Sequence, residues 1–229
     1  MAILKLSKIR RIYRKGDNEV VALSGLDLEV EKGEFTAVVG PSGSGKTTLL
    51  NIIGCLDSPT SGEVVYDGTP LKALGEKALA DYRKRHVSFV FQSYNLIPVL
   101  TVRENVELPL VIEKRLKPAE IKARALEVIA EVGLADKADR FPRELSGGQE
   151  QRVAIARALV KEPYVILADE PTANLDSHTA EEIVELMRKV NAERKTTFIF
   201  STHDKLVMQH ARRVVTIRDG ELVSDERKE

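Results

Sequence analysis

Short apolar runs separated by turn residues dominate the beginning and the end of the chain. Leu26, Leu28 and Val30 alternate with acidic residues, a pattern that predicts a strand with one buried face. Phe35–Val39 is a continuous apolar run that stops at Gly40, which is typical of a central strand that enters a loop. Further strands are predicted at 62–66, 86–92, 164–168, 196–201, 214–217 and 221–223, with hairpin turns at Asp67-Gly68 and Asp219-Gly220.

The middle of the chain has a helical pattern instead. The strand signals fade from Tyr94 to about Val160, and the apolar residues of 119–132 fall on one stripe of a helix. A second helix is predicted at 153–160. Another is predicted at 47–56, directly after a glycine-rich loop.

These elements predict an α/β fold with an inserted helical part. Residues 1–93 and 161–229 are expected to form the core, with an antiparallel β subdomain towards the N-terminus. Residues 94–160 are expected to form an α-helical subdomain. The charged segment 225–229 is expected to be a frayed tail. In such a fold the functional loops lie at the carboxyl ends of the parallel strands.

Composition narrows the class of protein. Of the 229 residues, 43% are hydrophobic and 31% are charged, which excludes global disorder. The 35 basic and 35 acidic residues cancel, which argues against a dedicated nucleic-acid binder. A single cysteine excludes an internal disulfide and favours a reducing cytoplasm. No run of about 18 apolar residues predicts a membrane span, and no signal peptide is expected.

The glycine-rich loop matches a phosphate-binding pattern. Residues 40–47 read Gly-Pro-Ser-Gly-Ser-Gly-Lys-Thr, which fits G-x-x-x-x-G-K-[ST]. The glycines, Gly40 included, let backbone N–H groups point at one anion, and the following helix adds its positive end. Lys46 would place an ammonium on the β- and γ-phosphates, and Thr47 would offer a hydroxyl to Mg²⁺. The alternative is a plain glycine-rich turn, which the buried strand before it and the helix after it disfavour.

Two adjacent acids follow a second buried strand. Asp169 and Glu170 end the apolar run 164–168. Asp169 is suited to hold Mg²⁺ through water, and Glu170 is suited to polarise an attacking water as general base. The alternative is that both acids cap the next turn, since Pro171 follows them. The phosphate loop elsewhere in the chain favours the catalytic interpretation.

A second anion-binding segment precedes the helix at 153–160. Residues 145–149 read Leu-Ser-Gly-Gly-Gln, in which Ser146 is a good N-cap and two glycines expose backbone N–H groups at a positive helix end. An ordinary capped helix start is the alternative. Two phosphate-type sites in one small domain are explained by a dimer in which each nucleotide lies between the phosphate loop of one chain and this segment of the other.

With this segment, essentially the whole chain resembles the ATP-binding subunit of an ATP-binding-cassette (ABC) transporter. The resemblance implies the ABC ATPase fold and Mg²⁺-dependent hydrolysis of ATP to ADP and phosphate. It also implies a head-to-tail, ATP-induced homodimer, an integral-membrane permease as partner, and a place on the inner face of the cell membrane. The implied phosphate cradle also includes Ser42, Gly43, Gly45 and Thr48. The implied signature contacts to nucleotide come from Ser146, Gly147, Gly148 and Gln149.

The resemblance implies further roles for four residues. Gln92 corresponds to the glutamine that reaches Mg²⁺ and the attacking water, and that relays the state of the site to the permease. His203 corresponds to the switch histidine that contacts the γ-phosphate. Asp176 belongs to the loop that crosses the dimer interface, and Tyr13 corresponds to the aromatic residue that stacks on adenine.

Two segments point to a particular branch of the family. Residues 51–57 and 96–106 resemble the lipoprotein-releasing, macrolide-export and cell-division group, so export or lipoprotein release is the expected work. The alternatives are a soluble ABC ATPase that acts on DNA or ribosomes, and a non-hydrolysing nucleotide-dependent scaffold. The chain length disfavours the first, and the presence of Glu170 and His203 disfavours the second.

Overall fold

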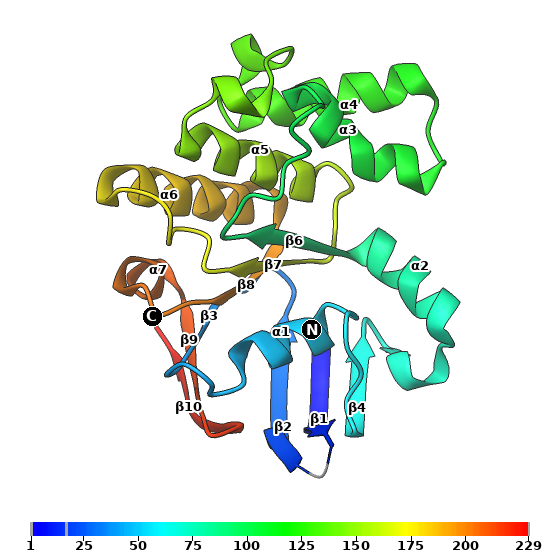
Figure 1. Cartoon of the computed structure of the whole chain (residues 1–229), viewed down its shortest axis with the longest axis vertical. Coiled ribbons are helices and arrows are strands. Elements are labelled where there is room, and N and C mark those ends of the chain that lie inside the picture. Colours follow the sequence, from blue (N-terminus) through cyan, green and yellow to red (C-terminus); the bar gives the residue numbers. More distant parts are fainter. Residues whose placement is uncertain (1, 17, 229) are drawn as a thin grey trace.

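The protein, described by a computed structural model over residues 2–16 and 18–228, has two β-sheets and a layer of helices. Figure 1 shows the helices α3, α4 and α5 gathered at one end, a mainly parallel sheet beneath them, and an antiparallel sheet at the opposite end. This arrangement confirms the predicted fold class.

The larger sheet has six strands in the order β10-β9-β3-β8-β7-β6. Its strands are β3 (Phe35–Val39), β6 (Val87–Phe91), β7 (Val165–Asp169), β8 (Thr197–Ser201), β9 (Arg213–Arg218) and β10 (Glu221–Arg227). Strands β6, β7, β8, β3 and β9 are parallel, and β10 closes the sheet as an antiparallel hairpin with β9. The carboxyl ends of the parallel strands therefore meet at one edge, where β3, β6, β7 and β8 each enter a predicted functional loop.

Both faces of this sheet are covered, which explains why its central strands read as continuous apolar runs. Ile166 and Ala168 of β7 join a hydrophobic cluster on the helical side, whereas Val165 and Leu167 join a second cluster on the other side. Because neighbouring residues of a strand point to opposite faces, a strand buried on both faces needs an apolar residue at every position.

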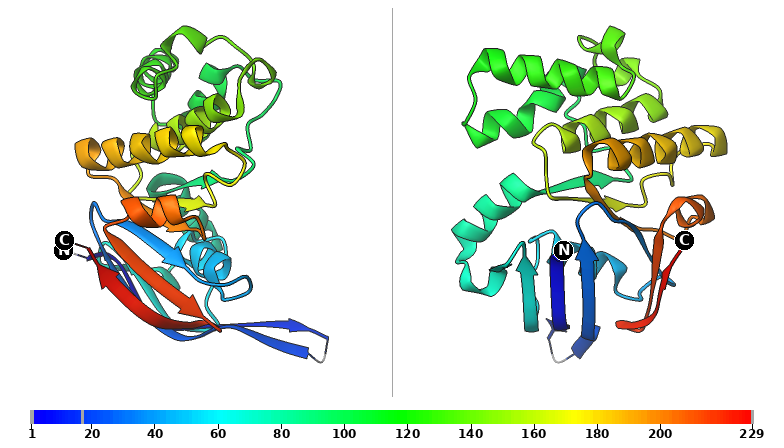
Figure 2. Two further views of the ribbon diagram at one scale, coloured as in Figure 1. Left: turned by 90° about the vertical axis from the view of Figure 1, so that its left-hand side faces the viewer. Right: turned by 180° about the vertical axis from the view of Figure 1, so that it is seen from behind.

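The second sheet is antiparallel and has four strands in the order β2-β1-β4-β5. These strands are β1 (Ala2–Lys15), β2 (Asn18–Glu31), β4 (Ser61–Tyr66) and β5 (Thr69–Pro70). The alternation predicted for β2 is confirmed, since Leu26, Leu28 and Val30 are buried. The left panel of Figure 2 shows the β1–β2 pair extending beyond the body of the molecule. Helix α1 (Lys46–Ile53) packs between this sheet and the larger one.

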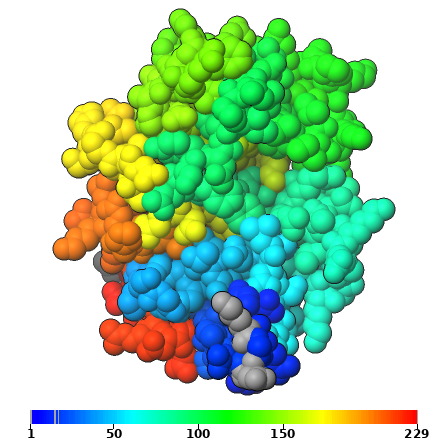
Figure 3. Space-filling model, in the orientation of Figure 1, coloured from blue at the N-terminus to red at the C-terminus, as the bar shows by residue number. Residues whose placement is uncertain are grey.

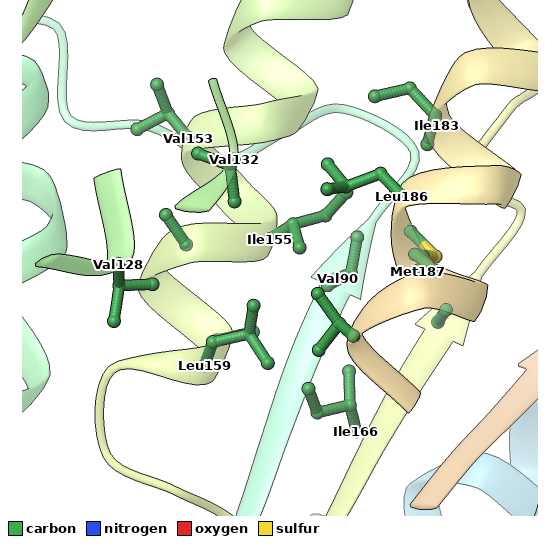
Figure 4. Packing of buried hydrophobic residues seen from close by; sticks show 14 of the residues in the cluster. Val90, Val128, Val132, Val153, Ile155, Leu159, Ile166, Ile183, Leu186 and Met187 are labelled. Carbon is green, nitrogen blue, oxygen red and sulfur yellow. The ribbon is translucent and has the colours of Figure 1, made fainter. Parts of the chain in front are cut away.

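The helices on the other face share one hydrophobic cluster with the sheet. They are α3 (Val102–Glu113), α4 (Pro118–Glu131), α5 (Gly147–Leu159), α6 (Ser177–Arg194) and α7 (Lys205–His210), with short 3₁₀ turns at Ala135–Lys137 and Pro142–Glu144. Figure 4 shows Val153, Ile155 and Leu159 of α5 between α4, α6 and the sheet. The predicted stripe of α4 is also buried. Helices α3, α4 and α5 lie inside the segment for which the sequence predicts a helical insertion.

Two features differ from the sequence predictions. The predicted frayed tail is wrong for residues 225–227, because β10 continues to Arg227 and Asp225 forms an ion pair with Arg213 (2.6 Å). The carboxylate of Asp225 therefore raises the pKa of the Arg213 guanidinium, and this pair holds the strand in place. Helix α2 (Glu76–His86) and the 3₁₀ turn Leu71–Ala73 were not predicted; α2 has no fully buried residue, and only its partly buried Leu79 and Tyr82 pack against the second hydrophobic cluster.

Candidate active site

The phosphate loop is shaped by three glycines, two of which leave no room for a side chain. Gly40, Gly43 and Gly45 all have positive φ angles, of 154°, 78° and 105°. A Cβ atom at Gly40 would lie 2.1 Å from the carbonyl oxygen of Ile217, and one at Gly45 would lie 2.5 Å from that of Ala22. The close approach of two neighbouring strands therefore fixes these glycines independently of any ligand.

Lys46, the first residue of α1, folds its side chain back over this loop. Its Nζ atom donates hydrogen bonds to the carbonyl oxygens of Gly40 (2.8 Å) and Pro41 (3.0 Å). No ion pair between Lys46 and a carboxylate is found in the described part of the chain. A cation at the start of a helix, beside a curled loop, is suited to bind a phosphate group.

The hairpin between β9 and β10 is hydrogen-bonded to the phosphate loop and supports it. The backbone N–H of Gly220 donates to the carbonyl oxygen of Ser44 (3.0 Å), and the carbonyl oxygen of Gly220 accepts from the N–H of Ser24 (2.9 Å). A Cβ at Gly220 would lie 2.9 Å from the carbonyl oxygen of Ala22. The sequence predicted this hairpin but gave no signal that it supports the phosphate loop.

The predicted catalytic acid and the predicted switch histidine lie in contact. Nδ1 of His203 is 2.6 Å from Oε1 of Glu170, and the hydroxyl of Thr202 donates to Oε2 (3.1 Å). Glu170 has a left-handed backbone (φ 47°), and its N–H donates to Ser201 of the neighbouring strand (2.9 Å). The side chain of His203 is 79% exposed and that of Glu170 is 20% exposed, so the histidine stands at the solvent side of the carboxylate.

A second layer supports this pair and was not predicted. The hydroxyl of Thr172 donates to Oδ2 of Asp204 (2.7 Å), and the N–H of Asp204 donates to the hydroxyl of Thr202 (3.0 Å). These contacts join the segment after β7 to the segment after β8. They involve a threonine and an aspartate that match no motif on their own.

Gln92 follows β6 at the same edge of the sheet, but it forms hydrogen bonds with Asn174 and not with the Glu170–His203 pair. Its Nε2 atom donates to Oδ1 of Asn174 (3.2 Å), and Nδ2 of Asn174 donates to the carbonyl oxygen of Gln92 (3.0 Å). The two residues therefore form a reciprocal pair between the glutamine loop and the loop after β7. Figure 3 shows these two segments, in green and yellow, beside the light-blue phosphate loop on one face of the molecule.

The donors predicted to meet a cation fit Mg²⁺ chemically. Thr47, Gln92 and Asp169 offer oxygen ligands, and Mg²⁺ in proteins is usually held by one or two carboxylates together with substrate phosphates. The Asp169 carboxylate has no hydrogen-bond or ion-pair partner among residues 2–16 and 18–228, so it is available for such a role. No group of three or more His, Cys, Asp or Glu side chains suited to a metal is found in those residues.

The signature segment starts α5 as a capped helix. The Ser146 hydroxyl accepts from the N–H of Gln149 (3.4 Å), and Gln149 Oε1 accepts from the N–H of Ser146 (3.1 Å), which forms a capping box. Gly148 is close to α6, where a Cβ would lie 2.4 Å from Thr179. No hydrogen bond or ion pair joins this segment to the phosphate loop within the described residues. Figure 1 shows α5 and α1 on opposite faces of the larger sheet.

Asp176 and Tyr13 are each held by neighbouring side chains. Asp176 caps α6 and accepts from the Thr179 hydroxyl (2.6 Å), which lowers the pKa of the Asp176 carboxyl. The Tyr13 hydroxyl donates to Asp57 (2.7 Å), and the guanidinium of Arg11 lies 4.6 Å from the ring centroid of Tyr13. Tyr13 as a whole is 38% exposed, so part of it is open to a ligand.

Comparison with known proteins identifies the family. A model of the ABC transporter family matches residues 23–173. This chain is a member of the ABC transporter family. An ABC transporter ATP-binding protein of Thermotoga maritima is 48% identical over 226 residues, which cover 99% of this chain and 96% of that protein. The predicted family and the predicted ATPase class of this ABC protein are confirmed.

Two further relatives are informative. The macrolide export ATP-binding/permease protein MacB of Shigella flexneri is 48% identical over 221 residues, which cover 96% of this ABC protein and 34% of MacB. A solved dimeric structure of the cassette MJ0796 of Methanocaldococcus jannaschii, in a post-hydrolysis state bound to ADP and phosphate, has a TM-score of 0.89 and 44% identity. That alignment covers 99% of both chains. No helix of the described residues is long and apolar enough to cross a membrane.

Proposed function

We propose that this ABC protein is the ATP-hydrolysing subunit of an export or lipoprotein-release transporter, and that two copies close on two ATP molecules. The observation that carries this proposal is the separation of the phosphate loop and the signature segment by the larger sheet. One nucleotide cannot meet both sites of the same chain, whereas two chains placed head to tail would complete two sites. The dimer found for MJ0796 supports this arrangement.

In this proposal each site residue has a separate role in ATP hydrolysis, which follows from its position. The phosphate loop, with Lys46 and the signature N–H groups of a second copy, binds the triphosphate and stabilises the charge that develops in the transition state. Glu170 accepts a proton from the attacking water, and His203 holds Glu170 in place and lies on the side open to the γ-phosphate. Mg²⁺, held by Thr47, Asp169 and the phosphates, with Gln92 reaching it in the closed state, would neutralise phosphate charge.

The partner in the membrane is inferred from relatives and from the surface. In MacB, the matching segment belongs to an ATP-binding/permease protein, so we assign a permease of this kind as partner and place this chain on the inner face of the membrane. A groove of about 290 Å³ beside β6 is lined by the apolar side chains Leu56, Phe89, Phe91 and Pro109 together with the basic residues Arg83, Lys84, Arg157 and Lys161. Val99, in the loop after β6, is 77% exposed. These apolar side chains next to the glutamine loop are suited to contact a cytoplasmic segment of the permease.

The test is phosphate release with Mg²⁺ and ATP. The wild-type protein is expected to hydrolyse ATP at a rate clearly above a Lys46→Ala variant, which lacks the ammonium over the phosphate loop. Addition of excess EDTA is expected to reduce the wild-type rate to that of the variant. A wild-type rate equal to the Lys46→Ala rate, with and without a co-purified permease, would instead favour a non-hydrolysing scaffold.

Tyr13 gives a separate test of the adenine site. Tyr13→Ala is expected to raise the KM for ATP roughly 5- to 150-fold with little change in kcat, because stacking of a base on an aromatic ring contributes about 1–3 kcal/mol. Tyr13→Phe is the matched control, since it keeps the ring and removes only the bond to Asp57. Equal KM values for all three proteins would remove Tyr13 from the adenine site.

A further inference from the structure

Arg157 lies near the end of α5 that is opposite to the signature segment. Its Nη2 atom donates to the carbonyl oxygen of Tyr94 (2.6 Å), and Nη1 donates to that of Asn95 (2.5 Å). Within the described residues no carboxylate forms an ion pair with it. Burial lowers the pKa of this guanidinium, but an arginine keeps its charge in proteins. The cation is therefore balanced mainly by two backbone carbonyls of the glutamine loop.

These two carbonyls converge because the backbone of the loop takes an uncommon shape. Tyr94 and Asn95 are consecutive residues with left-handed backbones, at φ angles of 58° and 52°. Such an angle is unusual for a tyrosine, whose side chain, unlike that of asparagine, cannot compensate by a hydrogen bond to its own backbone. The turn points both carbonyl oxygens at Arg157, so the arginine stabilises a conformation that the loop sequence does not favour.

The same loop also contacts the signature end of α5. A Cβ atom on Gly147 would lie 2.9 Å from the hydroxyl oxygen of Tyr94, so the tyrosine ring extends along the helix to its first residue. The glutamine loop therefore lies close to the first residue of α5 and is hydrogen-bonded to Arg157 in its last turn. A movement of α5 that carries the signature segment would carry residues 94–95 with it.

The hydrogen bonds between Gln92 and Asn174 are weaker than those that Arg157 donates to the loop. Both side chains are neutral and exposed, and their hydrogen bonds (3.0 and 3.2 Å) compete with water. Hydrogen bonds from a charged donor are shorter and roughly twice as strong as neutral ones. If the loop is displaced, the bond to Asn174 should therefore open before the bonds to Arg157.

We propose that Arg157 is a positioning residue that fastens the glutamine loop to the signature helix, and that the Gln92–Asn174 pair is the contact that opens when nucleotide closes the dimer. This inference rests on the proposed function, because it concerns the regulation of the same site. The loop and the signature segment move as one body, and Gln92 becomes free to approach the phosphates as that body turns.

The first experiment compares Arg157→Gln with Arg157→Lys and Asn174→Ala by steady-state ATP hydrolysis. Arg157→Gln is expected to lower kcat at least 10-fold and to change the KM for ATP less than 2-fold, because the phosphate loop and Tyr13 are untouched. Arg157→Lys should recover part of the loss. Asn174→Ala should act in the opposite direction, so that a Glu170→Gln background dimerises at a lower ATP concentration. If Asn174→Ala instead raised the ATP concentration at which the Glu170→Gln background dimerises, so that both substitutions impaired the cycle, the proposal would be overturned.

Hydrogen exchange measured by mass spectrometry separates positioning from general stability. In Arg157→Gln, exchange is expected to rise in residues 93–97 and to stay unchanged in the sheets; a rise across the whole chain, with no recovery in Arg157→Lys, would contradict the proposal. If the wild-type rate equals that of Lys46→Ala, the proposed function fails, whereas the exchange of residues 93–97 still reports whether Arg157 fastens the loop.

Discussion

Glu170→Gln is expected to bind ATP as tightly as the wild type and to hydrolyse it about 10²- to 10⁴-fold more slowly, the range typical of a lost general base. The amide keeps the size of the side chain and can still accept from Thr202 and contact His203, whose Nδ1 atom lies 2.6 Å from Glu170. It cannot accept a proton from water at neutral pH. Phosphate release and equilibrium binding of ATP measure the two halves of this expectation.

Glu162→Gln is a suitable control for this variant. Glu162 is exposed and pairs with Arg124, outside the loops at the carboxyl ends of the strands. Its substitution removes one carboxylate from the surface and should leave hydrolysis within a factor of about two of the wild-type rate, as is usual for surface substitutions. If Glu170→Gln and Glu162→Gln hydrolyse ATP at similar rates, Glu170 is not the base.

Ser146→Arg is expected to abolish the ATP-dependent dimer. Ser146 is exposed at the N-cap of α5, where the proposed arrangement places the γ-phosphate of the nucleotide bound to the second copy. An arginine there would fill the space between the two chains. The variant should still bind ATP as a monomer, because the phosphate loop leads into α1, which lies on the opposite face of the larger sheet from α5. Light scattering of Glu170→Gln with and without Ser146→Arg, in Mg²⁺ and ATP, measures the change in mass.

The loss of the helix cap must be separated from the steric effect. Ser146→Ala also loses the hydroxyl that accepts from Gln149, at a cost of about 1 kcal/mol in stability, but adds no bulk. It should therefore dimerise with ATP. A monomeric Ser146→Ala would indicate that the cap itself is needed, and a Ser146→Arg monomer without nucleotide affinity would place the signature segment in the site of its own chain.

Local patterns predicted the central strands and the loops that follow them, for a clear physical reason. A strand such as β7, buried on both faces, must be apolar at each position, and the change to Asp169 at its end marks the edge of the sheet. The phosphate loop is equally visible, because Gly40 and Gly45 approach other backbones too closely for any side chain. Such constraints can be recognised in the sequence, because each one fixes the type of residue at its own position.

Contacts between segments that are distant in the sequence cannot be recognised in this way, because they do not fix the type of either residue. Gln92 and Asn174 are 82 residues apart, and either side chain alone resembles an ordinary polar residue at the end of an element. Arg157 sits on a helix whose pattern predicts only burial or exposure, and the carbonyls that it holds belong to Tyr94 and Asn95. Helix α2 was missed because only its Leu79 and Tyr82 pack against the core, which are too few apolar residues to give a periodic signal.

The bracing of the phosphate loop by the β9–β10 hairpin has a consequence for the synthesis of the protein. Strand β3, which leads into the loop, pairs with β8 and β9, and Ser44 is held by Gly220. A ribosome makes these partners long after residues 40–47 have emerged. The phosphate loop of the nascent chain therefore lacks these supporting contacts until residues near 220 have left the exit tunnel.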